Sequence, residues 1–235
     1  MSRSLLLILC LAVAMAASLP VAAEEPRLAP LPESEWNAEQ RAVIEPLKQD
    51  GSVLNIFSTM GRNPALFQAF LGYGAYLLNA STLPARDREI LILRTGWLCQ
   101  SHYEWTQHAR IALEIGMSEK EIHNIAVGPD AKEWTDFERT LINVADELHY
   151  DSMISDATWE ALSAEYSTDQ LLDAIMTVGQ YNQVSMLLNS LRIQLEEGVA
   201  DSMPTDLPKL GLKMPMIRFP LLLSEPVPKI EVERE

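Results

Sequence analysis

The chain has 235 residues, of which 48% are hydrophobic and 22% are charged, with 10 glycines, 14 prolines and 2 cysteines. This composition excludes a disordered, collagen-like or disulfide-stapled protein, and it suffices for one domain, or two, with a sizeable core. The formal net charge of -15 argues against nucleic acid and anionic membranes as partners, because both are bound largely through lysine and arginine.

Residues 1–23 have the pattern of a secretory signal peptide. Arg3 provides a short positive region, residues 5–17 form an apolar run, and residues 21–23 (Val-Ala-Ala) offer a cleavage site before Glu24. The alternative is an uncleaved anchor, although a spanning helix needs about 20 apolar residues. We therefore expect an exported protein, periplasmic or secreted, with no membrane association after cleavage.

Signal cleavage would also remove Cys10 and leave Cys99 as a single cysteine. One cysteine cannot form an intramolecular disulfide, so an oxidising compartment would place no covalent constraint on the fold.

The rest of the chain has apolar residues at helical spacing and almost no alternation with period two. We therefore predict an all-α domain of about seven or eight helices at residues 35–197, after an extended segment at 24–34. The helix signals, in chain order, are Ser34, Pro64, Pro84, the break at Ser101, Gly116, the capping box Ser118–Glu121, the apolar spacing from Trp134 to Leu148, Asp156, and Ser167–Gln170 before a long helix to about Leu195.

From Met203 onward the sequence changes character. Prolines recur between Pro204 and Pro228 and forbid a helix, yet residues 217–223 are mostly apolar. A solvated tail would not normally carry such residues. We interpret residues 198–235 as an extended arm that lies on the domain or on a neighbouring subunit.

Two carboxylates and a histidine stand out as candidate catalytic groups. Glu104 and His108 are four residues apart on one predicted helix and so share a face. A carboxylate fixes the tautomer of an imidazole and raises its basicity, as a general base requires, although a surface ion pair has the same spacing. Glu89 lies where polar residues give way to an apolar run; it could be half-buried, or be an ordinary first-turn glutamate.

Several segments together have the pattern of one family: Arg88-Glu89-Ile90, Tyr103 to Ala109, Ala112 to Gly116, Ser118 to Ile122, Trp134 to Arg139, Ala145 to Leu148 and Val178 to Tyr181. Over roughly residues 35–197 the sequence resembles the carboxymuconolactone decarboxylase family, which includes the alkyl hydroperoxidase D proteins. The resemblance implies an all-helical fold that assembles into trimers or hexamers, with active sites near subunit interfaces.

The sequence departs from the hydroperoxidase members of this family at the cysteines. Those members carry a Glu, a Cys-x-x-Cys and a His in this order. Placing that pattern on Glu89 and His108 puts the cysteine positions at Ser101 and Glu104. Thiol–disulfide chemistry needs a second thiol to resolve the product, and Cys99 has none within the domain. We therefore place the chain in a cysteine-lacking branch and disfavour a peroxidase.

The decarboxylase and isomerase branch needs no cysteine, because it moves protons beside a carbonyl or carboxylate. The resemblance thus implies a cofactor-free lyase or isomerase that acts on a small organic acid or lactone. The candidate catalytic residues are His108, Glu104 and Glu89, and the candidate substrate-binding residues are Tyr103, His102 and Ser101.

Other functions stay open at this point. A peroxidase that uses Cys99 is one, and a non-catalytic oligomeric scaffold is another. A metal site built from Glu89, His102, Glu104 and His108 is not expected, because the spacings match neither His-Glu-x-x-His nor the Glu-x-x-His of di-iron bundles.

If cleavage follows residue 23, the mature chain should begin at Glu24. Intact-mass measurement of protein recovered from the periplasm or the medium should show this terminus. Recovery of the full-length chain from the membrane fraction would support the uncleaved anchor instead.

Overall fold

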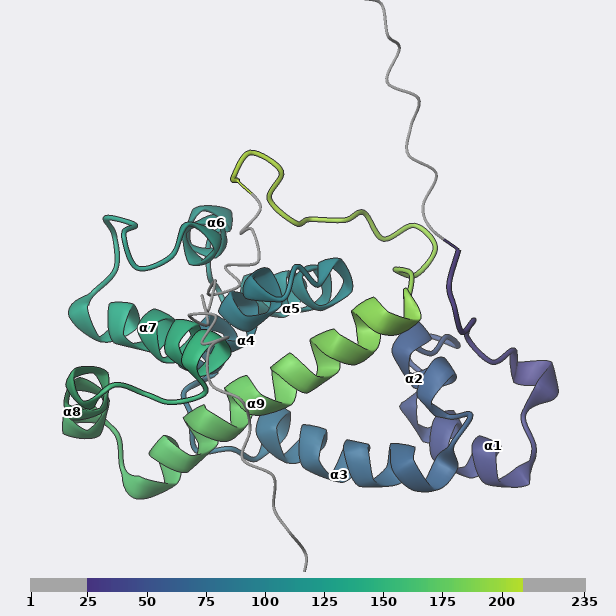
Figure 1. Ribbon diagram of the computed structural model, residues 1–235. Coiled ribbons are helices and arrows are strands. Elements are labelled where there is room, and N and C mark those ends of the chain that lie inside the picture. Colours follow the sequence, from purple (N-terminus) through teal and green to yellow (C-terminus); the bar gives the residue numbers. More distant parts are fainter. Residues whose placement is uncertain (1–24, 209–235) are drawn as a thin grey trace, which may run out of the picture.

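Nine α-helices and two short 3-10 turns form the part of the chain that the computed structural model describes, residues 25–208 (Figure 1). The predicted signal peptide and most of the predicted arm lie outside these residues. The helices are α1 Ala38–Ile44, α2 Asn55–Met60, α3 Pro64–Asn79, α4 Ala85–Leu98, α5 His102–Glu114, α6 Glu119–Val127, α7 Asp136–Asp151, α8 Asp156–Glu165 and α9 Thr168–Leu191. The all-α prediction is confirmed, and the extra helix is the six-residue α2.

Several helix boundaries follow the predicted signals. The capping boxes of Ser118 and Ser167 are present, and Gly116 takes a left-handed φ of 93° after α5, as expected of a residue that ends a helix. The break between α4 and α5 falls at Ser101.

Three predicted boundaries are wrong by a few residues. Ser34 lies in a 3-10 turn, and Asn37 caps α1 through a capping box with Gln40. Ser155, rather than Asp156, caps α8. The last helix ends at Leu191 because Arg192 turns to a left-handed φ of 55°. In each case a neighbouring residue supplied a cap or turn that helical periodicity does not reveal.

Helix α4 occupies the centre of the fold and packs against α5, α6, α7 and α9. All ten residues from Glu89 to Leu98 are buried, so each charge among them requires a partner. Arg94 meets this requirement with Asp146 at 2.6 Å and with the carbonyls of Ile125 and Ala126 at 3.0 and 2.9 Å.

Two apolar clusters hold the helices together. The larger one surrounds α4 and includes residues of α5 to α9. The smaller one joins α1, α2 and α3 to the C-terminal half of α9 and includes Tyr103 of α5. In Figure 1, α9 runs diagonally between these two groups of helices. Helices α5 and α9 therefore border both clusters.

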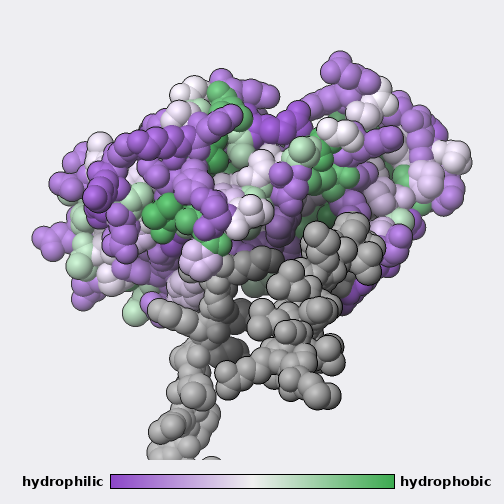
Figure 2. Space-filling view, turned by 90° about the horizontal axis from the view of Figure 1, so that it is seen from above, coloured by the Kyte–Doolittle hydropathy of each residue, from purple (hydrophilic) through white to green (hydrophobic). Residues whose placement is uncertain are grey.

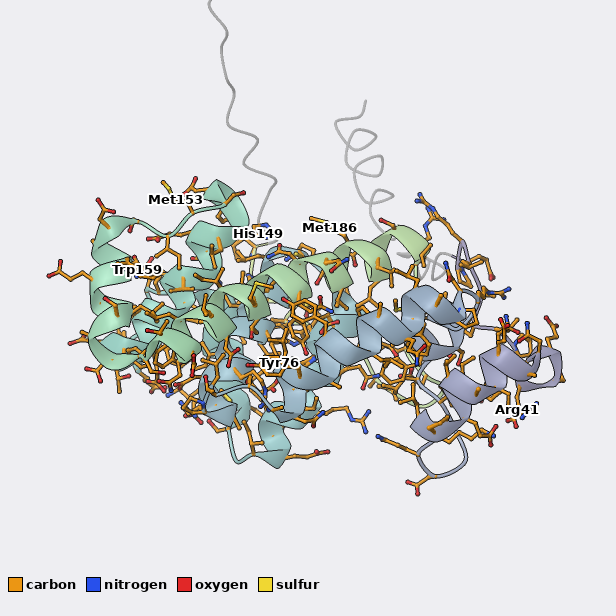
Figure 3. All side chains as sticks on the ribbon, turned by 90° about the horizontal axis from the view of Figure 1, so that it is seen from below. Arg41, Tyr76, His149, Met153, Trp159 and Met186 are labelled. Atoms are coloured by element: carbon orange, nitrogen blue, oxygen red, sulfur yellow. The ribbon has the colours of Figure 1, made fainter. Side chains whose placement is uncertain are left out.

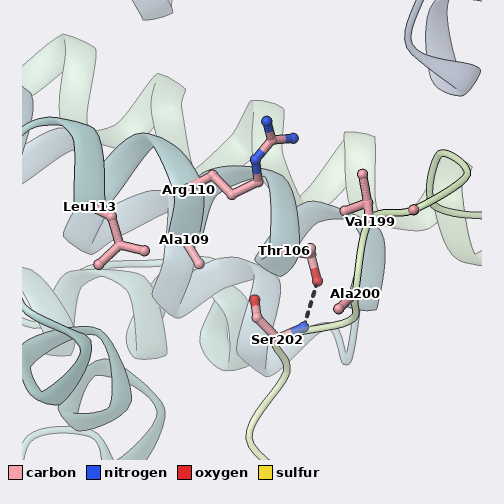
Figure 4. Close-up of a pocket in the computed structure, with 8 residues that line it drawn as sticks. Thr106, Ala109, Arg110, Leu113, Val199, Ala200 and Ser202 are labelled. Carbon is pink, nitrogen blue, oxygen red and sulfur yellow. Dashed lines mark hydrogen bonds between the residues drawn. The ribbon is translucent and has the colours of Figure 1, made fainter.

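The segments that flank the helices are tied to them by hydrogen bonds. Arg27 N donates to Leu191 O at 2.9 Å near the N-terminal end of the described chain. After α9, residues 198–208 run beside α5, where Trp105 Nε1 donates to Ser202 O at 3.0 Å. Ser202 N donates to Thr106 Oγ1 at 3.1 Å (Figure 4). Met203 then enters the larger apolar cluster.

The described surface seen from above is mostly hydrophilic, with a few apolar patches (Figure 2). Met153, Trp159 and Met186 are exposed and project from the helices (Figure 3). None of the helices between residues 25 and 208 is long and apolar enough to span a bilayer.

Met203→Ala should lower the free energy of unfolding by about 2–3 kcal/mol, because it empties a buried site at which 5% of the residue is exposed. Met153→Ala removes the same side chain at a site that is 68% exposed and should change stability by less than about 0.5 kcal/mol. Urea unfolding of both variants measures the difference. Equal effects would show that residue 203 does not pack in the core.

Candidate active site

A cavity of about 480 Å³ opens between α3, α5 and α9. Its walls are mainly apolar and include Phe57 and Phe70. The polar residues of the lining are Glu104, His108, Gln180 and Tyr181, together with Gln49, Asn79, Tyr103, Gln107, Arg110 and Glu114. Small-molecule sites commonly have this form, with apolar walls and a few convergent polar groups.

A second hollow, of about 350 Å³, lies between α5 and residues 198–202 (Figure 4). Its lining includes Thr106, Arg110 and Ser202 but none of the predicted catalytic residues. Because it lacks a carboxylate or an imidazole, we take the larger cavity as the candidate active site.

His108 lies between two carboxylates in the wall of the larger cavity. Its Nδ1 is 2.7 Å from Glu89 Oε2, and its Nε2 is 3.1 Å from Glu104 Oε1. Carboxylates accept hydrogen bonds, so both ring nitrogens act as donors and the ring is an imidazolium. Burial alone would lower the pKa of His108, but the charges and hydrogen bonds of Glu89 and Glu104 outweigh it and raise the pKa to about 10.

Glu89 is fully buried, whereas its position in the sequence predicted either half-burial or an ordinary glutamate in the first turn of a helix. The difference arises because α4 is enclosed from Glu89 onward. Its other oxygen, Oε1, accepts a hydrogen bond from Arg88 Nε at 3.2 Å. Arg88 and His108 thus lie against the carboxyl groups of Glu89 and Glu104, and these contacts offset part of the cost of burying the two carboxyl groups.

Glu104 contacts both His108 and the cavity. It comes from the first turn of α5 and is 5% exposed. Glu89, by contrast, does not line the cavity and lies behind His108. The three predicted catalytic residues therefore form a line, Glu89–His108–Glu104, that leads from the interior to the cavity.

Of the three predicted substrate-binding residues, one lines the cavity and two do not. Tyr103 lines the cavity, but its hydroxyl donates to Glu196 Oε1 at 2.6 Å. Burial and the Glu196 carboxylate hold the pKa of Tyr103 well above its ordinary value. Ser101 is fully buried before α5, and His102 is exposed with its Nδ1 2.6 Å from Asp201 Oδ2. Neither Ser101 nor His102 lines the cavity.

Two residues of α9 that line the cavity were not predicted from the sequence as site residues. The Tyr181 ring packs edge-to-face with His108, with centroids 4.9 Å apart. Burial, with the nearby Glu104 and Glu89 charges, raises the pKa of Tyr181 well above its usual range, so it remains a neutral phenol. Its segment, Val178 to Tyr181, matched the family pattern but carried no spacing relation to His108.

Gln180 is the second of these residues. It is 3% exposed, and neither its Nε2 nor its Oε1 has a hydrogen-bond partner among the described residues. An unpaired buried polar group costs about 1–3 kcal/mol. The segment Val178 to Tyr181, which resembles the family, contains Gln180, but a single glutamine in an apolar helix has no spacing that marks it as a site residue.

Cys99 lies at the end of α4 and does not line the cavity. Its thiol donates to Asn182 Oδ1 at 3.3 Å. Burial raises the pKa of Cys99 to about 11, so the thiol stays protonated near neutral pH. A thiol in this state is a poor nucleophile.

Metal binding would require ligands that face a common point. Within residues 25–208 there is no group of three or more His, Cys, Asp or Glu side chains that could hold an ion. The oxygen and nitrogen atoms of Glu89, His108 and Glu104 that face one another are joined by hydrogen bonds.

Comparison with known proteins finds a matching family model. Residues 64–147 match the model of the carboxymuconolactone decarboxylase family, so this part of the chain is similar to the domain of that family. The match includes Glu89, Glu104 and His108, so the family resemblance predicted from these residues is confirmed. The sequence has no match among curated proteins.

Solved structures share the fold of this domain. An uncharacterised peroxidase-related protein with an alkylhydroperoxidase AhpD core from Ralstonia eutropha has 20% identity and a TM-score of 0.63, over 74% of this chain and 95% of that chain. A peroxidase-related protein from Silicibacter sp. has 15% identity and a TM-score of 0.61, over 79% and 97%. The debrominase Bmp8 has 17% identity and a TM-score of 0.61, over 72% and 92%.

His108 should remain protonated well above neutral pH. A histidine in an unfolded chain has a pKa of about 6.5, and that of folded His108 is about 10. The stabilisation from its charged form is therefore complete below about pH 6.5 and is lost as the pH rises through about 10. Imidazole ¹⁵N shifts and urea unfolding across this range measure both effects.

His123→Gln is the matched control, because His123 is 38% exposed and lies on the surface. This variant should leave the His108 shifts unchanged. A His108 ring that loses its proton near pH 6.5 would contradict the imidazolium assignment.

Proposed function

We propose that this protein is a cofactor-free acid–base enzyme, a decarboxylase or an isomerase, that acts on a small lactone or related carbonyl compound. The observation that supports it is the line Glu89–His108–Glu104, which ends at the wall of a mainly apolar cavity. Acid–base groups at the wall of a cavity can move a proton to and from a bound molecule.

Glu104 is the base in this proposal, although the sequence alone suggested His108. A protonated His108 cannot accept a proton, whereas Glu104 is a carboxylate that lines the cavity. When Glu104 takes a proton from the carbon beside the substrate carbonyl, its hold on the Nε2 hydrogen of His108 weakens. That hydrogen can then be donated to the enolate oxygen that develops. Glu89 keeps the ring charged and oriented.

Decarboxylation and isomerisation differ only in the step that forms the enolate. It forms by loss of carbon dioxide in the first reaction and by loss of a proton in the second. In both, protonation of a carbon from Glu104 completes the turnover, so Glu104 would return a proton that it had received from substrate or solvent.

The lining favours a substrate with a mainly apolar body and little negative charge. Apolar side chains of α3, α5 and α9 form most of the wall. The lining has two acidic residues, Glu104 and Glu114, beside Arg110 and the imidazolium of His108, and the whole chain carries a formal charge of -15. The charge of the whole chain favours a lactone over an organic acid. It thereby favours isomerisation, since decarboxylation requires a carboxylate on the substrate. We also propose that the protein is exported and forms a trimer or hexamer.

A peroxidase remains the second candidate, since two structural neighbours are described as peroxidase-related. It would have to use Cys99. That thiol lies outside the cavity and is the free cysteine of the described residues, and its pKa of about 11 keeps it protonated. These observations favour the acid–base proposal.

Glu104→Gln and His108→Gln should each lower turnover by about 10²- to 10⁴-fold, the range that general acid–base catalysis contributes. The assay is a screen of small lactones in D₂O, followed by NMR for exchange of the hydrogen beside the carbonyl and by release of carbon dioxide. Because His108→Gln leaves two carboxylates without their shared cation, it should also be less stable by about 3–5 kcal/mol.

The double variant Glu89→Gln/His108→Gln removes a carboxylate together with the imidazolium and serves as a folded control for the loss of activity. Cys99→Ser should keep nearly full turnover. If Cys99→Ser abolished activity with folding intact, and peroxide were consumed with a dithiol, the peroxidase would be correct. An absence of turnover across the screen, in every variant, would favour the scaffold.

A further inference from the structure

The side chain of Gln180 indicates which substrates the cavity can bind, which the line Glu89–His108–Glu104 does not. Its side-chain amide is buried in the cavity wall, with both the Nε2 donor and the Oε1 acceptor unpartnered among residues 25–208. Buried polar groups in native proteins are nearly always hydrogen-bonded. Other buried side chains of the described residues also have an unpartnered polar atom, but among these residues Gln180 is the one that lines the cavity, where a ligand could supply the partners.

A glycine lies close to this amide. Gly74 of α3 also lines the cavity, and a Cβ placed there would be 4.0 Å from Gln180 Nε2. A larger side chain at this position would crowd the amide and the cavity beside it.

The amide selects a particular pattern of ligand atoms. Its Nε2 needs an acceptor, and its Oε1 needs a donor close beside that acceptor. A carboxylate offers acceptors only, and its charge would share the cavity wall with Glu104. A carbonyl next to an N–H or O–H group satisfies both atoms without adding charge.

We propose that Gln180 is the recognition residue of this cavity and selects neutral cyclic compounds in which a carbonyl adjoins an N–H or O–H donor, such as lactams and hydroxy-lactones. Two parallel hydrogen bonds to the amide would fix the ring in its plane. The inference deepens the proposed function and rests on it for the reaction that follows binding, whereas recognition itself is measurable without turnover.

Two probes of nearly the same shape isolate this effect. The lactam 2-quinolone presents a carbonyl beside an N–H, and the lactone coumarin presents a carbonyl beside a ring oxygen. We expect the wild-type protein to bind 2-quinolone at least about tenfold more tightly than coumarin, because coumarin leaves the Oε1 unpaired. Naphthoate, which is anionic, should bind more weakly than either. Isothermal titration or ligand fluorescence measures the affinities.

Gln180→Met keeps the length of the side chain and removes its hydrogen bonds. In this variant the two probes should bind within about twofold of each other. Its melting temperature without ligand should equal or exceed that of the wild-type protein, since an unsatisfied amide is replaced by an apolar group. Gly74→Val should weaken both probes by narrowing the cavity.

Several results would overturn the inference. Equal affinities in the wild-type protein, a preference that persists in Gln180→Met, or no binding of any probe would each do so. A melting temperature well below wild type would show that Gln180 is held by the protein rather than by a ligand. Glu104→Gln should retain the preference for 2-quinolone, so a failure of the acid–base proposal is seen in turnover alone.

Discussion

The imidazolium of His108 between two buried carboxylates is the interaction on which the rest of the site depends. It joins α4 to α5, since Glu89 is on one helix and Glu104 and His108 are on the other. The two helices are in close contact here: a Cβ at Gly96 would lie 3.6 Å from Glu104 Cγ, an ordinary van der Waals distance. Removal of the His108 charge would leave both carboxyl groups without the cation between them, which ties the register of the two helices to the chemistry.

Local signals predicted most of the helices because they depend on neighbouring residues. Helix α3 spans Pro64–Asn79, as its proline and apolar spacing indicated. Predictions failed where two adjacent residues could both cap, as at Ser155 and Asp156. The burial of Glu89 was underestimated for another reason: how deeply a helix is enclosed depends on the helices that pack around it, and one segment does not contain that information.

Contacts within the candidate site were easier to predict for residues that are close in the sequence than for residues that are far apart. The spacing of Glu104 and His108 identified their contact directly, and the family resemblance added Glu89 from another helix. Tyr181 and Gln180 come from α9, far along the chain, and only the fold brings them to the same cavity. The protonation state of His108 was also hidden, because it results from two carboxylates acting together. This reverses the role that the i, i+4 pair alone suggested, and Glu104 is the base in the mechanism that we propose.

The position of Glu104 also separates the proposed chemistry from that of the hydroperoxidases that the family includes. In the pattern that the chain resembles, Glu104 stands where those members have a cysteine. A thiol beside an imidazolium would be ionised and ready for oxidation, whereas a carboxylate there is ionised but cannot be oxidised by a peroxide. A buried imidazolium can thus stabilise a thiolate where a cysteine lies beside it, or the charge of a carboxylate base where a glutamate lies beside it. Both cysteine positions of that pattern differ in this chain, at Ser101 and Glu104, so the thiol chemistry is lost and proton transfer beside His108 is the chemistry that we propose in its place.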